Sequence, residues 1–185
     1  MQKSKLFVVT ASHFCVDTYA TLLAPLLPLM MAKMGLSLAS AGLLASFFSV
    51  TSFSQPFMGV WGDRMKRRRL IIGGLVLASV MPLMGVADTY PMLLVILFLG
   101  GIGVAAFHPQ VFSLVGELSQ PRRSFGISVF VFGGTLGIGL TPWWAPYFAD
   151  RLGLHWLPVL MPFGVIFALL LLRFVPLDNP QVTAR

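Results

Sequence analysis

Six long apolar runs constrain the fold of this chain more than any other feature of its sequence. Each run is close to the roughly 20 apolar residues that a helix needs to cross a lipid bilayer. The runs do not alternate between polar and apolar residues, so they do not indicate transmembrane strands. The sequence predicts an all-α integral membrane protein whose single domain, residues 1–185, contains helices at about 6–31, 39–61, 70–87, 91–116, 124–148 and 156–175.

Charged residues are sparse and lie mainly in the gaps between these runs. Only 10% of the residues are charged and 57% are hydrophobic, whereas soluble domains carry about 25% charged residues. The net charge of +7 does not indicate a nucleic-acid partner, because the basic residues do not line one solvated face. We therefore expect the lipid bilayer as a partner and no nucleic acid.

The basic residues also orient the predicted bundle. If the N-terminus is cytoplasmic, only Lys33 and Arg151 of the 13 lysines and arginines fall outside, and the other eleven fall inside. Cytoplasmic connections of membrane proteins are enriched in lysine and arginine. Because the predicted number of helices is even, we expect both termini in the cytoplasm.

The most basic gap has an ordered sequence, GVWGDRMKRRRL at residues 59–70. Gly59 permits close approach to another helix. Asp63 follows near the end of a predicted helix, where an acidic group is unfavourable, so we expect it to face a positive group elsewhere. The alternative is that the basic residues only fix the topology and bind anionic headgroups.

This string resembles the loop motif Gly-x-x-x-Asp-Arg-x-Gly-Arg-Arg of the major facilitator superfamily. Gly59, Asp63, Arg64, Arg67 and Arg68 stand at the matching positions, and a lysine replaces the second glycine. The stretches HFCVDTYATLLAPLLPLM, GVAAFHPQ and FVFGGTLGIGLTP are similar to the fosmidomycin-resistance branch of that family. The resemblance implies the N-terminal half of a transporter, a six-helix bundle built as two inverted three-helix repeats.

The same resemblance implies a function in the bacterial inner membrane. We expect half of a secondary transporter that exports small organic molecules by alternating access and that needs a second six-helix half or a homodimer partner. The chain could be an excised half, a truncated product or a natural half, and the sequence does not choose among these three. Leu97 replaces an arginine, and Thr141 a glycine, that occur in proton-driven members, which weakens the transfer of their antiport mechanism. The alternatives are a non-transporting membrane scaffold or assembly subunit and a passive pore.

Few ionisable residues lie inside the predicted membrane helices, where such groups are costly and commonly functional, and three of them form a candidate set. His13 and Asp17 are four residues apart on one helix face, and His108 lies at a comparable depth in the fourth predicted helix. A carboxylate beside histidines can relay protons, because histidine titrates near neutrality. The alternative is a structural hydrogen-bonded contact between the two helices.

Small residues and prolines within the helices predict packing contacts or bending sites: Gly101, Pro109, Gly133, Gly134, Gly137 and Pro142. Methionine pairs such as Met30 and Met34 are typical of flexible packing, with copper transport as the weaker alternative. We expect no metal site and no cofactor. No nucleotide-binding or hydrolase pattern occurs, so we expect neither an ATP-driven pump nor an enzyme.

The resemblance also places an acidic residue beside the basic loop. Glu117, at the end of the fourth predicted helix, is the candidate. We expect Glu117 to pair with Arg67 or Arg64, and Asp63 and Gly59 to face the partner half. This pairing would form a gate that is closed toward the cytoplasm in one conformation.

Overall fold

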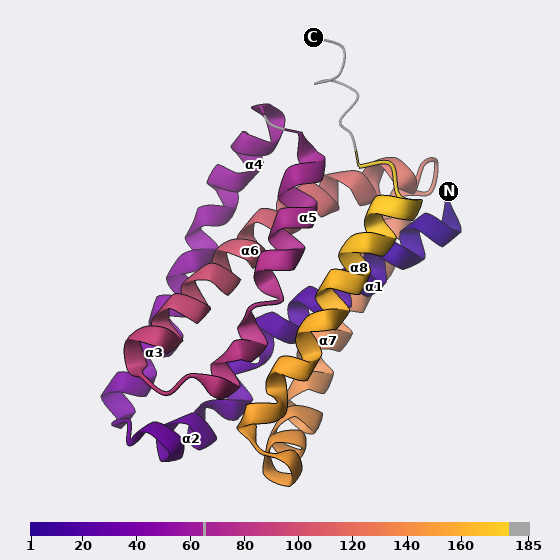
Figure 1. Ribbon diagram of the computed structural model, residues 1–185. Coiled ribbons are helices and arrows are strands. Elements are labelled where there is room, and N and C mark those ends of the chain that lie inside the picture. Colours follow the sequence, from indigo (N-terminus) through magenta and orange to yellow (C-terminus); the bar gives the residue numbers. More distant parts are fainter. Residues whose placement is uncertain (65, 178–185) are drawn as a thin grey trace.

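The computed structural model describes residues 1–64 and 66–177, and this part of the chain is helical throughout, without a strand (Figure 1). The elements in chain order are α1 (Lys3–Thr21), α2 (Leu23–Met34), α3 (Leu38–Thr51), η1 (Ser52–Ser54), α4 (Gln55–Arg64), α5 (Arg67–Ala78), η2 (Met81–Val86), α6 (Tyr90–Leu118), α7 (Arg123–Leu152), η3 (Leu154–Leu160) and α8 (Met161–Phe174). The η elements are short 3₁₀ helices.

Five segments of the described part are long and apolar enough to cross a membrane. They are Lys3–Met34, Arg67–Val86, Tyr90–Leu118, Arg123–Leu152 and Leu154–Phe174. The helix expected at 39–61 is divided into α3, η1 and α4, and neither α3 nor α4 alone has the length to span a bilayer. Five spans are thus found where six were predicted, and the sixth stays a prediction, as does the inverted-repeat organisation.

Prolines explain where these helices are interrupted. A proline lacks the N–H that would bond to the carbonyl four residues earlier, and its ring clashes with that carbonyl. Each interruption begins at or just after that earlier residue: Thr21 before Pro25, Ser52 before Pro56 and Ala78 before Pro82. By contrast, α6 and α7 continue without a break through Pro109 and Pro142.

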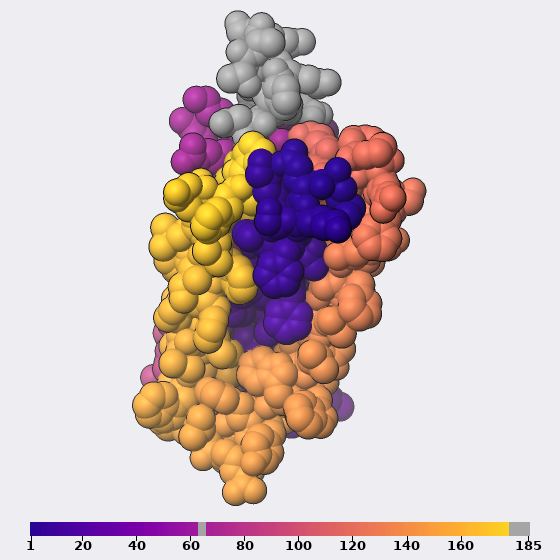
Figure 2. Space-filling view, turned by 90° about the vertical axis from the view of Figure 1, so that its right-hand side faces the viewer, coloured from indigo at the N-terminus to yellow at the C-terminus, as the bar shows by residue number. Residues whose placement is uncertain are grey.

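The helices pack most closely in two pairs, α1 along α7 and α5 along α6. Glycines make both contacts possible. A Cβ atom at Gly137 of α7 would overlap the carbonyl oxygen of Phe14 in α1, and one at Gly103 of α6 would overlap the backbone of α5 at Ala78. Small residues let helix backbones approach closely in membranes. Figure 2 shows the indigo start of α1 between yellow α8 and the orange part of α7.

The start of α1 and the end of α8 lie at the same end of the bundle, together with the end of α4 and the start of α5 (Figure 1). The amino group of Met1 donates to the carbonyl of Gln120 at 2.7 Å, which ties the N-terminus to the connection between α6 and α7. Lys33 and Arg151 lie in the last turns of α2 and α7 at the opposite end. Lys33 pairs there with Asp88 at 3.1 Å. The segregation of charge expected from the sequence is therefore present between the two ends.

Candidate functional site

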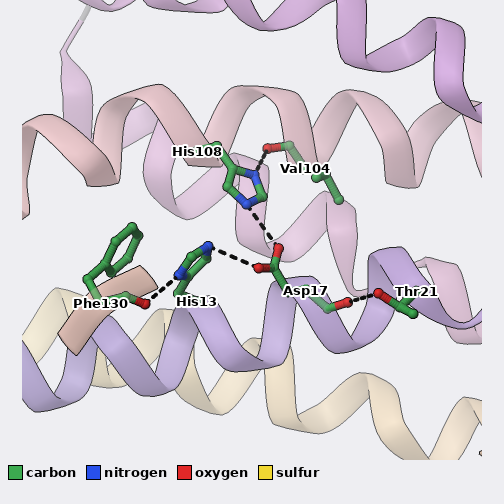
Figure 3. A network of polar contacts seen from close by, with 6 residues as sticks. All are labelled: His13, Asp17, Thr21, Val104, His108 and Phe130. Atoms are coloured by element: carbon green, nitrogen blue, oxygen red, sulfur yellow. Dashed lines mark hydrogen bonds and ion pairs between the residues drawn. The ribbon is translucent and has the colours of Figure 1, made fainter. Parts of the chain in front are cut away.

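His13, Asp17 and His108 form one polar cluster between α1 and α6 (Figure 3). The Nε2 atom of His13 lies 3.1 Å from Oδ2 of Asp17, one helical turn away on α1. The Nε2 atom of His108, on α6, lies 2.9 Å from Oδ1 of the same carboxyl group. One carboxyl group therefore joins two imidazoles from two helices.

Backbone carbonyls fix which nitrogen of each imidazole carries a proton. Nδ1 of His13 lies 2.9 Å from the carbonyl oxygen of Phe130 in α7, and Nδ1 of His108 lies 2.8 Å from that of Val104. A carbonyl oxygen only accepts hydrogen bonds, so both Nδ1 atoms donate. In a neutral ring the Nε2 atom facing Asp17 then carries a lone pair. Each contact with the carboxylate consequently needs an additional proton.

Gly134 of α7 makes room for this cluster. A Cβ atom at that position would overlap Oδ2 of Asp17 and Cε1 of His13, and it would lie 2.7 Å from Nδ1 of His13. The His13 ring also stacks on Phe130, with 3.9 Å between centroids and 11° between planes. The absence of a side chain at Gly134 therefore lets the His13 ring approach the α7 backbone at Phe130.

The cluster is open mainly at His108. The side chains of His13 and Asp17 are 8% and 10% exposed, whereas that of His108 is 24% exposed. His108 is thus the member through which protons or water could reach the buried pair.

Two imidazoles and a carboxylate are also common metal-binding groups, and their ligand atoms lie within 4.8 Å of one another. Each imidazole, however, meets a different oxygen of Asp17. The polar atoms are directed at one another and not at a common point. We interpret the cluster as a hydrogen-bonded one.

Glu117 pairs with Arg67, one of its two expected partners. The guanidinium donates to both carboxylate oxygens, at 2.6 and 3.0 Å, and its Nε donates to the carbonyl of Leu177 at 3.3 Å. Arg67 begins α5 and Glu117 lies in the last turn of α6, so each charge has the less favourable sign for its helix end. The pair offsets both charges and joins the two helices.

The rest of the loop motif is divided between described and undescribed side chains. Arg68 is exposed at the start of α5. The side chains of Asp63 and Arg64 lie outside the described residues. Gly59 faces a groove that it shares with Pro109 and residues of η1 and its neighbours, and a Cβ atom there would make only ordinary contact with Pro109 at 3.8 Å.

Within the described part of the chain, the tight contact of α4 falls at Gly62, and the expected approach of Gly59 to the partner half stays a prediction. A Cβ atom at Gly62 would overlap the side chain of Gln110 in α6, which donates to the carbonyl of Met58 at 2.9 Å. Gly101 likewise leaves room for the hydroxyl of Thr51. Gly133 packs on Thr10. The glycines singled out in α6 and α7 therefore lie at contacts between helices.

Sequence reasoning missed two polar contacts. The first is the Phe130 carbonyl that bonds to His13, because a backbone acceptor leaves no signal in residue type. The second is Tyr19, whose hydroxyl donates to the carbonyl of Leu160 at 2.6 Å and accepts from the N–H of Gly164 at 2.9 Å. An isolated tyrosine in the middle of an apolar run was the available signal, since buried tyrosine hydroxyls find partners.

Comparisons with known proteins give one consistent result. The profile of the Major Facilitator Superfamily matches residues 9–185. The fosmidomycin resistance protein of Escherichia coli is 27% identical over 136 residues, which cover 72% of this chain and 34% of that protein. The quinolone resistance protein NorA of Staphylococcus aureus is 27% identical over 164 residues, which cover 81% of this chain and 42% of that protein.

Among solved structures, the fold is similar to that of the peptide transporter POT in complex with sulfate. The TM-score is 0.78 at 22% identity, and the match covers 95% of this chain and 40% of that one. At this identity the likeness concerns the fold alone. In all three comparisons the chain spans less than half the length of the protein that it matches.

Proposed function

The chain belongs to the Major Facilitator Superfamily, and from this membership we propose that it forms one half of a secondary active transporter that exports small organic molecules. The family resemblance predicted from the loop motif is confirmed. Two relatives are named for resistance to fosmidomycin and to quinolones, which supports small organic molecules as the substrate class. The segments long and apolar enough to span a bilayer support a multi-pass membrane protein.

The proposed transporter is completed by a second six-helix bundle, either another chain or a second copy. The support is the length of the relatives, of which this chain covers 34% and 42%. In this proposal the second predicted span consists of α3, η1 and α4. Both termini face the cytoplasm of a bacterial inner membrane, because the strongly basic end of the bundle is the end where α1 begins and α8 ends.

The observation that carries the proposal is the cluster at Asp17. When both imidazoles are protonated, each Nε2 atom donates to one oxygen of the carboxylate, and α1 and α6 are held together. When a proton leaves, a lone pair faces a carboxylate oxygen, and that contact loses its attraction. Gain and loss of a proton would thereby tighten and loosen the contact between α1 and α6.

This coupling requires that few other groups act on the carboxylate. Within the described residues, the charged or titratable side chains that contact Asp17 are His13 on α1 and His108 on α6. From α7, the cluster meets a backbone carbonyl at Phe130 and no side chain at Gly134. Because His108 is the most exposed member, proton exchange would begin there.

The loop at the basic end serves in this proposal as a gate. Arg67 and Glu117 hold α5 to α6 at the cytoplasmic side, Gly59 faces the second bundle, and Arg68 adds to the positive surface. Asp63 and Arg64, whose side chains lie outside the described residues, belong to the proposed gate by the family motif alone. Rocking of the two bundles would separate these contacts. Gly101, Gly133, Gly137, Pro109 and Pro142 would let α6 and α7 adjust during that motion.

The test is Asp17→Asn in the chain assembled with its partner bundle in proteoliposomes. Fosmidomycin and a quinolone serve as probes, and a pH-sensitive dye reports proton movement. We expect loss of compound-dependent proton movement with the protein still folded. The matched control is Asp150→Asn, an exposed acid near the other end of α7, which should transport normally.

Two results would count against the proposal. Unchanged proton-coupled transport by the Asp17→Asn variant would contradict the proposed role of the cluster as a proton relay. Folded wild-type assemblies that move neither compound nor protons would favour the alternative of a non-transporting membrane scaffold.

A further inference from the structure

Three basic side chains at the start of α5 point away from the ion pair that holds this helix to α6. Arg67 turns inward to Glu117 and is 2% exposed. Lys66, Arg68 and Arg69 are exposed. Among the described side chains, no carboxylate forms an ion pair with any of these three. They form a compact positive surface at the end of the bundle where α1 begins and α8 ends.

Two apolar grooves begin beneath this surface. One, of about 400 Å³, is lined by the three basic residues together with Ile72, Gly73 and Leu172, and it lies between α5 and α8. The other, of about 360 Å³, runs from Arg69 along the opposite side of α5 to Val80 and includes Trp61 of α4. Arg69 and Gly73 belong to both grooves.

Gly73 keeps the junction of the grooves open. A Cβ atom at this position would have no neighbour within 4 Å. Close helix packing therefore does not explain the glycine at this position. The surface at the junction is therefore a shallow apolar depression, one helical turn after Arg69 along α5.

The length of the second groove fits one leaflet of a membrane. Val80 follows Arg69 by eleven residues, which corresponds to about 16 Å at the rise of an α-helix. Half of a hydrocarbon core of about 30 Å is about 15 Å. Positive groups at the membrane surface with apolar grooves beneath them match the two parts of an anionic lipid, a charged headgroup and acyl chains.

We propose that this surface is a binding site for an anionic diacyl phospholipid. Its phosphate lies against Lys66, Arg68 and Arg69, and its two acyl chains follow the two grooves that diverge at Gly73. A soluble phosphate would use the positive groups alone, so the grooves identify a lipid as the occupant. This site shares no residue with the Asp17 cluster.

Trp61 provides a probe inside the site. In a variant with Trp143, Trp144 and Trp156 changed to phenylalanine, its fluorescence is measured in nanodiscs that contain a fixed minor fraction of one brominated lipid. We expect brominated phosphatidylglycerol to quench at least twofold more than brominated phosphatidylcholine. Equal quenching by the two lipids would overturn the proposal.

Two further variants separate the charges from the grooves. Arg68→Gln with Arg69→Gln should abolish the preference, whereas Lys3→Gln with Arg122→Gln, which removes equal charge from exposed positions at the same end, should preserve it. Gly73→Leu should reduce the preference without changing the charge. An equal loss in the Lys3/Arg122 control would mean that only general charge attracts the lipid, and it would overturn the site.

Native mass spectrometry of the unaltered chain gives an independent measurement that needs no tryptophan replacement. After extraction from mixed phosphatidylglycerol and phosphatidylcholine membranes, we expect one phosphatidylglycerol to be retained. The Arg68/Arg69 variant should lose it, and added inorganic phosphate should not displace it. Retention by that variant, or displacement by phosphate, would contradict the proposal.

Discussion

Gly134→Ala is the smallest change that should disturb the polar cluster. The added methyl group would overlap Asp17 Oδ2 and His13 Cε1. Either α7 must move away from α1, or the His13 ring must turn and lose its bond to the carbonyl of Phe130. Both adjustments act on the same buried contact.

The expected change in unfolding free energy follows from two destabilising contributions and one stabilising contribution. Overpacking a buried contact costs typically about 1–3 kcal/mol, and loss of the histidine hydrogen bond adds about 1 kcal/mol. Alanine favours a helix over glycine by about 1 kcal/mol, which offsets part of this. We expect the variant to lose about 1–3 kcal/mol of stability by the same figures.

Gly139→Ala is a matched control on the same helix, because a Cβ atom there has no neighbour within 4 Å. It should gain up to about 1 kcal/mol from helix propensity alone. Unfolding of both variants in mixed micelles, followed by circular dichroism, should therefore separate them by roughly 2–4 kcal/mol. Equal stability of the two variants would refute the close contact between α1 and α7.

Two predictions concern the basic end of the bundle. Glu117→Gln should lower the unfolding free energy by about 1–2 kcal/mol, between the values for exposed and buried pairs. The reason is that the Arg67 side chain is 3% exposed and that of Glu117 is 48% exposed. A double-mutant cycle with Arg67→Met that gives no coupling energy would contradict this. Reporters fused to the C-terminus should be active only in the cytoplasm, and neutralising Arg67, Arg68 and Arg69 should weaken that orientation; periplasmic activity of the unaltered fusion would reverse the assignment.

The sequence predicted contacts that depend on side-chain type and spacing. His13 and Asp17 share a face because they are one turn apart, and the depth of His108 in its run placed it at their level. The pairing of Glu117 with Arg67 or Arg64 was predicted from the family's loop motif and the position of an acid at a helix end, and the structure has Arg67. These predictions needed no knowledge of how helices rotate about their axes.

Contacts that depend on helix rotation could not be predicted in this way. Gly59 and Gly62 are three residues apart in α4, and only the packing of that helix on α6 shows that Gly62 is the tight one. The hydrogen bond from His13 to Phe130 depends on how deeply α1 lies against α7. Pro56 could have indicated the division of the second predicted span, whereas the continuous hydropathy of that span does not register the 3₁₀ turn η1.

The interruptions in the helices have a consequence for backbone polarity in lipid. In η1 the N–H of Gln55 bonds to the carbonyl of Ser52, one residue nearer than in an α-helix. The carbonyl of Thr51 thereby loses its α-helical partner. The hydroxyl of Ser54 donates to that carbonyl at 2.6 Å.

The same substitution of donors occurs where α5 gives way to η2. The N–H of Val80 bonds to Leu77 and not to Val76, and the hydroxyl of Ser79 donates to the carbonyl of Val76 at 2.6 Å. A carbonyl without a donor would cost several kcal/mol in hydrocarbon, of the order of an unsatisfied buried group. Serine hydroxyls therefore satisfy carbonyls that the 3₁₀ turns leave without an α-helical donor, so these helices can bend within a long apolar segment without leaving those carbonyls unpaired.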